Sequence, residues 1–495
     1  VAKKIHRKAK KKQKTGEVVR TDKWKLHPTE LQHHYCHLTV SEYRKYVRAL
    51  IGIAYTHWHE MADMSIKERL TFVESLIHPT AKRPSVKYEY FKQAKHKSFL
   101  KFPSYLRRAA INNAIGQVSS FVTRYRTWQS KVRNRRDARP PRLTADTGVY
   151  PALYQGQCIK FGDGYTTAEI KLWDGSDWTW HKIPVSGHRS RHLVDTNKRK
   201  SPSLVVSERK CHLSVPFGIN PKDLPSKEKV LSVDLGINTT ATVAVVSSTG
   251  TVMHREFIHP SKDIDRRDSR LRRISAKASE TLGGKGGKKR CDQSRGNLRQ
   301  VKGTSMKGKL YRGFCRPLYR KATNINREIA QKVSRAIVNI AKSFDVQVIV
   351  FENLSGWRPK GGKKRSTLKQ RYHGWLKSRL QELTEQKWSE LGGKVQYVLP
   401  HYTSKYAYDG SGQVRRDQKN YALAVFSTGK RYNADLNGTL NIAARYWHKV
   451  LKGQKSREVW LGKSSRHTPR IPVTLSAIWT LHLDCRGEDT PSTTS

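Results

Sequence analysis

The chain has 495 residues, of which 97 are lysine or arginine and 39 are aspartate or glutamate, so its formal net charge is +58 at pH 7. A folded protein with this excess repels itself unless a polyanion neutralises it, and nucleic acid is the partner that the charge favours. Aromatic residues make up 9% of the chain, which excludes a wholly disordered polyelectrolyte, and no apolar run approaches the roughly 20 residues that span a bilayer.

Two further features concern location and cysteine chemistry. The first residues contain no apolar segment typical of a secretory signal, so we expect a cytoplasmic protein without a membrane partner. The six cysteines show no C-x-x-C spacing and are expected to be separate reduced thiols. Composition alone leaves a ribosomal-type or histone-like protein without catalytic chemistry as the alternative.

The N-terminal part predicts a basic arm followed by helices. Residues 1–26 contain almost no core-forming side chains, so we expect this arm to be ordered only against phosphate; the arm and the start of the next domain occupy 1–37. Residues 38–137 show helical periodicity. One helix face collects apolar side chains: Leu106, Ala110, Ile111, Ile115, Val118 and Phe121. Its polar side carries arginines that we expect to bind nucleic acid: Arg107, Arg108 and Arg124.

Residues 138–225 predict a small antiparallel β domain. Short runs of aromatic and β-branched residues alternate there with turn signals, and 203–215 predicts a hairpin that turns at 208–210. The tryptophans of this domain could stack on bases, although such residues more often belong to the core. They are Trp173, Trp178 and Trp180.

Three acidic residues stand where the sequence otherwise predicts buried strands or the start of a helix. Asp234 and Glu352 each end an apolar run, and Asp435 opens a helix. A carboxylate beside a buried strand is costly to desolvate unless a metal ion or hydrogen bonds compensate. An aspartate at a helix start is usually an N-cap, so the prediction rests on the three acids together.

These acids can converge on one edge of a mixed sheet. Three oxygen ligands with open positions suit Mg²⁺ or Mn²⁺ rather than zinc. Paired divalent ions about 3.5–4 Å apart can activate a water molecule and stabilise the leaving oxygen of a phosphodiester. The pattern therefore predicts a two-metal site for phosphodiester hydrolysis, whose catalytic and metal-binding residues are Asp234, Glu352 and Asp435.

The segments between the acids are basic. A predicted helix over 262–280 carries arginines that we expect to contact the phosphate backbone: Arg266, Arg267, Arg270, Arg272 and Arg273. Residues 281–310 are rich in glycine and basic residues and predict a mobile loop, and 451–495 predict a basic, partly disordered tail.

Three segments around the acids resemble the RuvC motifs of TnpB transposon-encoded nucleases and the compact type V CRISPR effectors. They are SVDLGINTTA (232–241), VFENLSG (350–356) and YNADLNGTLNIA (432–443). The resemblance covers roughly 226–447 and implies an α/β multidomain protein with an RNase H-like (RuvC) nuclease domain over 226–450. By layout, 38–137 would be a helical recognition lobe and 138–225 an antiparallel, barrel-like wedge domain.

The same resemblance implies a function. The chain would bind a guide RNA and cleave complementary target DNA beside a short flanking motif by Mg²⁺-dependent hydrolysis, with sequence reading delegated to base pairing. It would act as one monomer per guide in the cytoplasm of a prokaryote, associated with the nucleoid. Many relatives carry a four-cysteine zinc element between the second and third motifs, but 400–431 here contains no cysteine. We therefore expect zinc-finger-like hairpins without zinc.

Two other functions stay open. A ribonucleoprotein of the same kind could bind DNA without cutting it, as a regulator or a recruiter. A guide-free enzyme of the RNase H fold, such as a Holliday-junction resolvase or a transposase, is the other. Retention of all three acids favours cleavage over binding alone, and a resolvase would not need the charge of +58.

Overall fold

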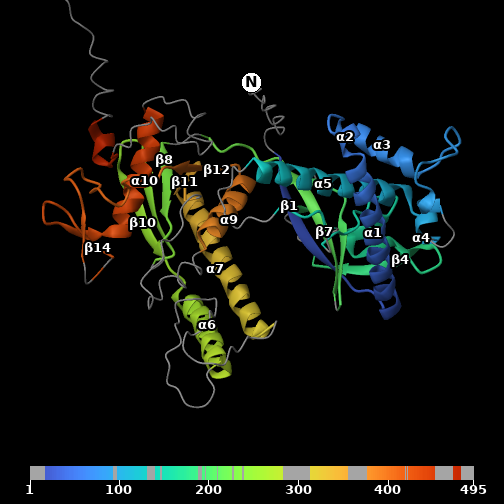
Figure 1. The fold of residues 1–495 in the computed structure, drawn as a ribbon. Helices are drawn as coiled ribbons and strands as arrows, with labels where there is room; N and C mark the ends of the chain where they lie inside the picture. Colours follow the sequence, from blue (N-terminus) through green and yellow to red (C-terminus); the bar gives the residue numbers. More distant parts are fainter. Residues whose placement is uncertain are drawn as a thin grey trace, which may run out of the picture. The chain divides into compact units, whose positions relative to one another are not determined.

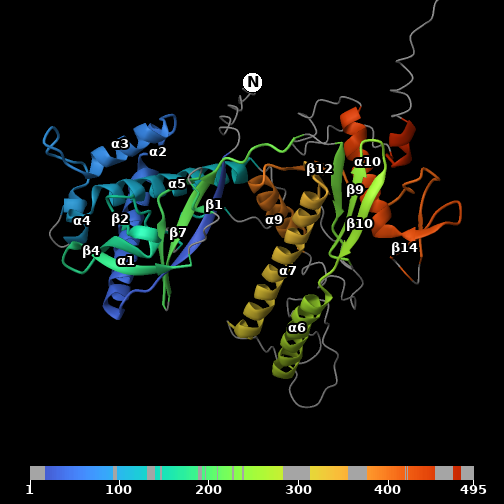
Figure 2. The same ribbon diagram turned by 180° about the vertical axis from the view of Figure 1, so that it is seen from behind.

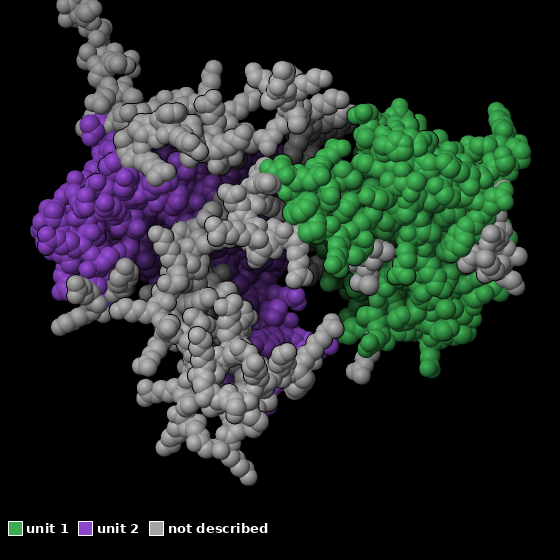
Figure 3. Space-filling view, in the orientation of Figure 1, with its two compact units in different colours: residues 1–220 green, residues 221–495 purple. Residues whose placement is uncertain are grey.

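The computed structural model divides the chain into two compact units, 1–220 (unit 1) and 221–495 (unit 2), which Figure 3 shows in different colours. The structure describes residues 17–92, 97–130, 140–144, 148–187, 192–194, 197–208, 210–225, 228–236, 239–282, 313–354, 376–417, 420, 422–451 and 472–480. The predicted mobile loop, apart from its first two residues, lies outside these ranges, as do most of the basic tail and the start of the N-terminal arm. None of the helices within the described ranges combines the length and apolar character that crossing a membrane requires.

Unit 1 contains an antiparallel sheet that curls into a half-barrel with the strand order β2-β3-β4-β1-β7-β5, with β6 also paired to β7 (Figure 1). Its strands are β1 (Val18–Leu26), β2 (Ile159–Phe161), β3 (Thr167–Trp173), β4 (Trp178–Ser186), β5 (Lys198–Arg199), β6 (Ser203–Ser207) and β7 (Lys210–Ile219). The predicted hairpin is present as β6 and β7, which pair from Ser203↔Ser214 to Ser207↔Lys210.

The expectation that 1–26 forms an arm without core residues is wrong for its second half. Strand β1 lies between β4 and β7 and pairs with β7 along its whole length. Trp24 is fully buried, and Asp22 and Leu26 are buried on the same side of the strand. Lys23 and Lys25 alternate with them and face solvent. This period of two marks a strand, but the lysines hid it.

The helices of unit 1 are α1 (Glu30–Thr56), α2 (Trp58–Met61), α3 (Ile66–Ile77), α4 (Lys97–Leu100) and α5 (Ser104–Gln129), with short 3-10 helices at Glu89–Lys92 and Asp163–Tyr165. Helix α1 packs against the antiparallel sheet, α5 packs on α1, and α3 packs on α5. Capping boxes start α1 at Thr29 and α3 at Ser65, which satisfies backbone N–H groups at both helix starts. The apolar face predicted for α5 is buried throughout. The cysteines within the described residues, Cys36, Cys158, Cys211 and Cys315, are free thiols, as predicted.

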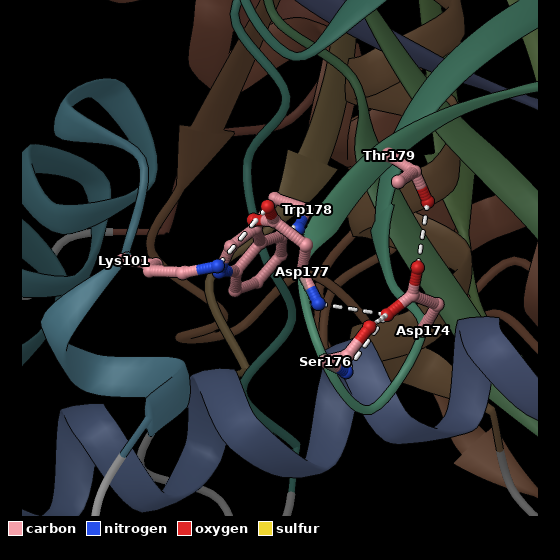
Figure 4. Close-up of polar contacts among 6 residues, drawn as sticks. All are labelled: Lys101, Asp174, Ser176, Asp177, Trp178 and Thr179. Atoms are coloured by element: carbon pink, nitrogen blue, oxygen red, sulfur yellow. Dashed lines mark hydrogen bonds and ion pairs between the residues drawn. The ribbon is translucent and has the colours of Figure 1, made fainter. Parts of the chain in front are cut away.

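The turn between β3 and β4 is held by an aspartate (Figure 4). Oδ1 of Asp174 accepts hydrogen bonds of 2.8 Å from the backbone N–H groups of Ser176 and Asp177. These bonds lower the pKa of Asp174 to about 2. Asp177 in turn pairs with Lys101 at 3.1 Å, which ties the turn to the residue after α4. Of the tryptophans here, Trp173 and Trp178 are buried and Trp180 is 39% exposed.

Unit 2 is built on a mixed sheet with the order β10-β9-β8-β11-β12. The strands are β8 (Lys229–Asp234), β9 (Ala241–Ser247), β10 (Val252–Ile258), β11 (Val348–Glu352) and β12 (Lys394–Val398). The first three form an antiparallel meander, and β11 runs parallel to both β8 and β12. This strand order is that of an RNase H-like domain, which confirms the predicted fold of the C-terminal part.

Helices cover both faces of this sheet (Figures 1 and 2). They are α6 (Ser261–Leu282), α7 (Arg316–Ser343), α9 (Lys377–Glu390) and α10 (Ala434–Leu451). In β8, Leu231 and Val233 pack towards α7 and α9, whereas Val230 packs towards α10. The near-continuous apolar strands follow from burial on both sides. Helix α6 packs on α7 beyond the sheet.

A small three-stranded sheet precedes α10 and contains β13 (Arg415–Arg416), β14 (Leu423–Val425) and β15 (Arg431–Asn433). Gly410 and Gly429 have φ angles of +83° and +81°, a backbone conformation that tight turns require and that glycine adopts readily. Its core is formed by apolar and aromatic side chains, with Phe426 at the centre. Lys430 lies 4.9 Å from the ring of Tyr408 and donates a hydrogen bond to its hydroxyl.

Candidate active site

The sheet of unit 2 brings two of the predicted acids to the same edge. Asp234 is the last residue of β8 and Glu352 the last residue of β11. The two strands are parallel neighbours with Val233 opposite Phe351, so the acids leave the sheet side by side. Asp435 is the second residue of α10, which crosses the face formed by β8 and β9.

The electrostatics show that the three acids interact. Burial raises the pKa of Asp234 well above its usual range, and the negative charges of Glu352 and Asp435 raise it further. Burial likewise raises the pKa of Glu352 and of Asp435. Each carboxylate is therefore costly to ionise here in the absence of a cation.

Helix α10 approaches Asp234 through a glycine. A Cβ atom built on Gly438 would lie 3.2 Å from Oδ2 of Asp234. That distance is shorter than nine in ten of the contacts that real Cβ atoms make, so an added Cβ would require a small displacement of its neighbour. Gly438 thus lets the helix that carries Asp435 pass directly over the carboxylate of Asp234.

An arginine that sequence reasoning missed also belongs to this site. The positive charge of Arg416, in β13, lowers the pKa of both Asp234 and Asp435 and so opposes the effect of burial. The sequence around Arg416 does not predict this contact, because nothing in 400–431 indicates that the segment lies near the acids. The three-stranded sheet positions this guanidinium group near acids from two other elements.

The surroundings of Glu352 are polar on one side. The Thr403 hydroxyl donates a hydrogen bond of 2.5 Å to its Oε1, and this bond lowers the pKa of Glu352 against the effect of burial. The positive charge of Arg445, in α10, acts in the same direction. Neither residue was among those predicted.

The donor set fits a divalent cation by its chemistry. The three carboxylates are partly buried, and the charges of Glu352 and Asp435 add to the effect of burial in raising the pKa of Asp234. A hard cation with oxygen ligands would offset this repulsion. Among the residues that the structure describes, no three His, Cys, Asp or Glu side chains are arranged so that they could hold one metal ion.

The arginines predicted on α5 fall into two groups. Arg107 is buried and its Nε lies 3.1 Å from Oε1 of Glu74, so its charge is used inside unit 1 and the predicted phosphate contact does not hold for it. Arg108 shares the same carboxylate at 3.3 Å but is half exposed. Arg124 is exposed near the end of α5.

The arginines of α6 are similarly divided. The side chain of Arg267 is 11% exposed and pairs with Asp268 at 2.8 Å. Arg270 donates a hydrogen bond to the backbone carbonyl of Arg266. The guanidinium group of Arg266 pairs with the carboxylate of Asp263, with Nη1 3.4 Å from Oδ1. Arg272 and Arg273 are exposed. The exposed guanidinium groups are the ones that remain available to phosphate.

Two solved structures are similar to this chain over most of its length. The Cas12f1–sgRNA–target DNA complex has a TM-score of 0.47 and 10% identity, over 86% of this chain and 99% of that one. The mini-RNA-guided endonuclease CRISPR-Cas_phi3 has a TM-score of 0.44 and 12% identity, over 87% of this chain and 93% of that one.

Sequence comparisons identify a matching family model and a similar protein. The model of the Aq_aa04 family matches residues 20–174, within unit 1. The TnpB-like protein aq_aa05 of Aquifex aeolicus (strain VF5) is 32% identical over 169 residues, which are 32% of this chain and 55% of that protein. The chain thus spans about half of the length of this curated relative. The chain is therefore similar to a TnpB-like protein over part of its length.

Proposed function

We propose that this protein binds a guide RNA and cleaves complementary DNA by Mg²⁺-dependent hydrolysis, at a site formed by Asp234, Glu352 and Asp435. The observation that carries the proposal is the mutual electrostatic effect of these acids at one edge of an RNase H-like sheet. The net charge of +58 supports a polyanionic partner. The relationship to a TnpB-like protein supports the assignment to this kind of nuclease.

The three carboxylates would hold the metal. When bound, divalent ions supply a water molecule activated for attack and stabilisation of the leaving oxygen of the phosphodiester. Arg416 keeps Asp234 and Asp435 closer to their ionised forms, since its charge lowers the pKa of both. Gly438 leaves room for the carboxylate of Asp234 beneath α10.

Nucleic acid would be gripped by both units. In this proposal 38–137 serves as the recognition lobe and 138–225 as the wedge domain. The exposed Arg124, Arg272 and Arg273 contact the phosphate backbone, which fixes register without reading sequence. Base pairing with the guide then selects the target.

The test has two steps. RNA that copurifies with the protein is sequenced, and the purified complex is incubated with Mg²⁺ and a plasmid that carries the sequence complementary to the guide. We expect one discrete structured RNA and cleavage of the matched plasmid only. Random cellular RNA would contradict guide binding, and a discrete RNA with uncut plasmid would indicate a DNA-binding ribonucleoprotein that does not cut.

A further inference from the structure

The loop that follows β12 delivers a hydroxyl group to the acid at the end of β11. Thr403 is 3% exposed, and its Oγ1 lies 2.5 Å from Oε1 of Glu352. The carbonyl of Pro400 is a more distant acceptor, at 3.4 Å. A hydroxyl has a single proton to donate, and the shorter contact to a carboxylate takes it.

Two asparagines of α10 hold this loop in place. Nδ2 of Asn441 donates to the carbonyls of Thr403 and Tyr406, both at 2.9 Å. Nδ2 of Asn437 donates to the same Tyr406 carbonyl at 2.8 Å, and its Oδ1 accepts from the backbone N–H of Tyr408 at 2.8 Å. Both asparagines are buried and stand one helical turn apart, on the same face of α10.

The orientation of these amides is fixed by their partners. A flipped Asn441 would place its oxygen against two carbonyl oxygens, and a flipped Asn437 would place an N–H₂ group against the N–H of Tyr408. The helix that carries Asp435 therefore also sets where Thr403 meets Glu352. Two of the three acids are thus linked through one rigid element.

We propose that Thr403 is a positioning residue for the metal site, holding the Glu352 carboxylate in the orientation that binds the cation, with Asn437 and Asn441 fixing the loop that carries it. The proposal rests on the function proposed above. Partners behind a ligand typically change metal affinity by about 10–100-fold when they are removed, because the ligand then loses its orientation.

The test compares Thr403→Val with Thr403→Ser in the full chain. Valine keeps the shape and removes the hydroxyl, whereas serine keeps the hydroxyl. Mn²⁺ is the probe, and electron paramagnetic resonance of the free ion measures its binding without requiring cleavage. We expect Thr403→Val to weaken Mn²⁺ binding about tenfold or more and Thr403→Ser to stay within about threefold of the unmodified chain. Equal binding by Thr403→Val and the unmodified chain would overturn the inference.

The same substitution in a chain that also carries Glu352→Gln distinguishes the positioning of Glu352 by Thr403 from a general loss of structure. In the Glu352→Gln chain the hydroxyl no longer has a metal-binding carboxylate to orient, so adding Thr403→Val should change Mn²⁺ binding less than twofold. A further tenfold loss there would show that Thr403 acts through the fold and would overturn the inference. If the unmodified chain and Asp234→Ala show the same absence of Mn²⁺ binding, the proposed function itself is contradicted.

Discussion

A Cβ atom on Gly438 would lie 3.2 Å from Oδ2 of Asp234, so the helix that carries the third acid rests directly on the first. The glycine stands inside α10, where alanine would ordinarily favour the helix by about 1 kcal/mol. Gly438 lowers the stability of α10 but leaves space for the carboxylate of Asp234. The position of that carboxylate therefore matters more here than the propensity of the helix.

Gly438→Ala should therefore separate stability from catalysis. The gain in helix propensity opposes the crowding, so we expect the free energy of unfolding to change by less than about 1 kcal/mol. Cleavage should fall roughly tenfold or more, because the Asp234 carboxylate must move. The matched control is Gly52→Ala in α1, where an added Cβ would meet no described atom within 4 Å. The control should be stabilised slightly and should cut normally, and normal cutting by Gly438→Ala would contradict the close approach.

Arg416→Ala should shift the pH dependence of cleavage. The charge of Arg416 lowers the pKa of Asp234 and Asp435, so without it both acids hold their protons to higher pH. The acid limb of the pH–rate profile should then move to higher pH, and Arg416→Lys should restore most of the original profile. An unchanged acid limb in Arg416→Ala would contradict the electrostatic role.

The strand-end acids could be predicted because burial leaves a strong pattern. Apolar runs that end in Asp234 and Glu352 indicate strands covered on both faces, and parallel neighbours bring their ends together. The buried face of α5 was equally clear from its periodicity. In both cases the pattern that predicts the structure lies within the sequence of a single strand or helix.

The residues that sequence reasoning missed depend on contacts between elements. Arg416 and Thr403 come from a short sheet and a loop, whose positions relative to the acids are set by packing and by the asparagines of α10. Arg107 and Arg108 are adjacent in the sequence and both pair with Glu74, and only the packing of α5 leaves Arg107 buried and Arg108 half exposed. Strand β1 was obscured because its lysines raise the local charge, and only Trp24 and Leu26 among its apolar residues are buried in the core.

Arg107 and Arg124 should respond differently to substitution. Arg107→Ala leaves Glu74 with one partner fewer inside unit 1, so it should destabilise the fold by roughly 2 kcal/mol in urea unfolding. Arg124→Ala should leave stability unchanged within about 0.5 kcal/mol and lower RNA affinity, with the slope of log affinity against log salt reduced by about 1. The reverse pattern would contradict the division between buried and exposed arginines.

The turn at Asp174 should make part of the stability of unit 1 depend on pH. The folded pKa of about 2 lies below the ordinary value near 3.9, so the stabilisation is complete above about pH 4 and disappears as the pH falls towards 2. Asp174→Ala should cost about 1 kcal/mol at pH 5, and the difference from the unmodified chain should approach zero near pH 2. Urea unfolding of the nucleic-acid-free chain at several pH values measures this, and a difference independent of pH would contradict the role of the carboxylate.

Asp234→Ala tests the central claim most directly, with cleavage and DNA binding measured on the same guide-loaded complex. Phosphate contacts elsewhere dominate affinity, so we predict that cleavage falls at least about a thousandfold while the dissociation constant for matched DNA changes less than about threefold. Cleavage that persists in Asp234→Ala, or binding that is lost together with it, would contradict the assignment of this acid to a metal-dependent nuclease site.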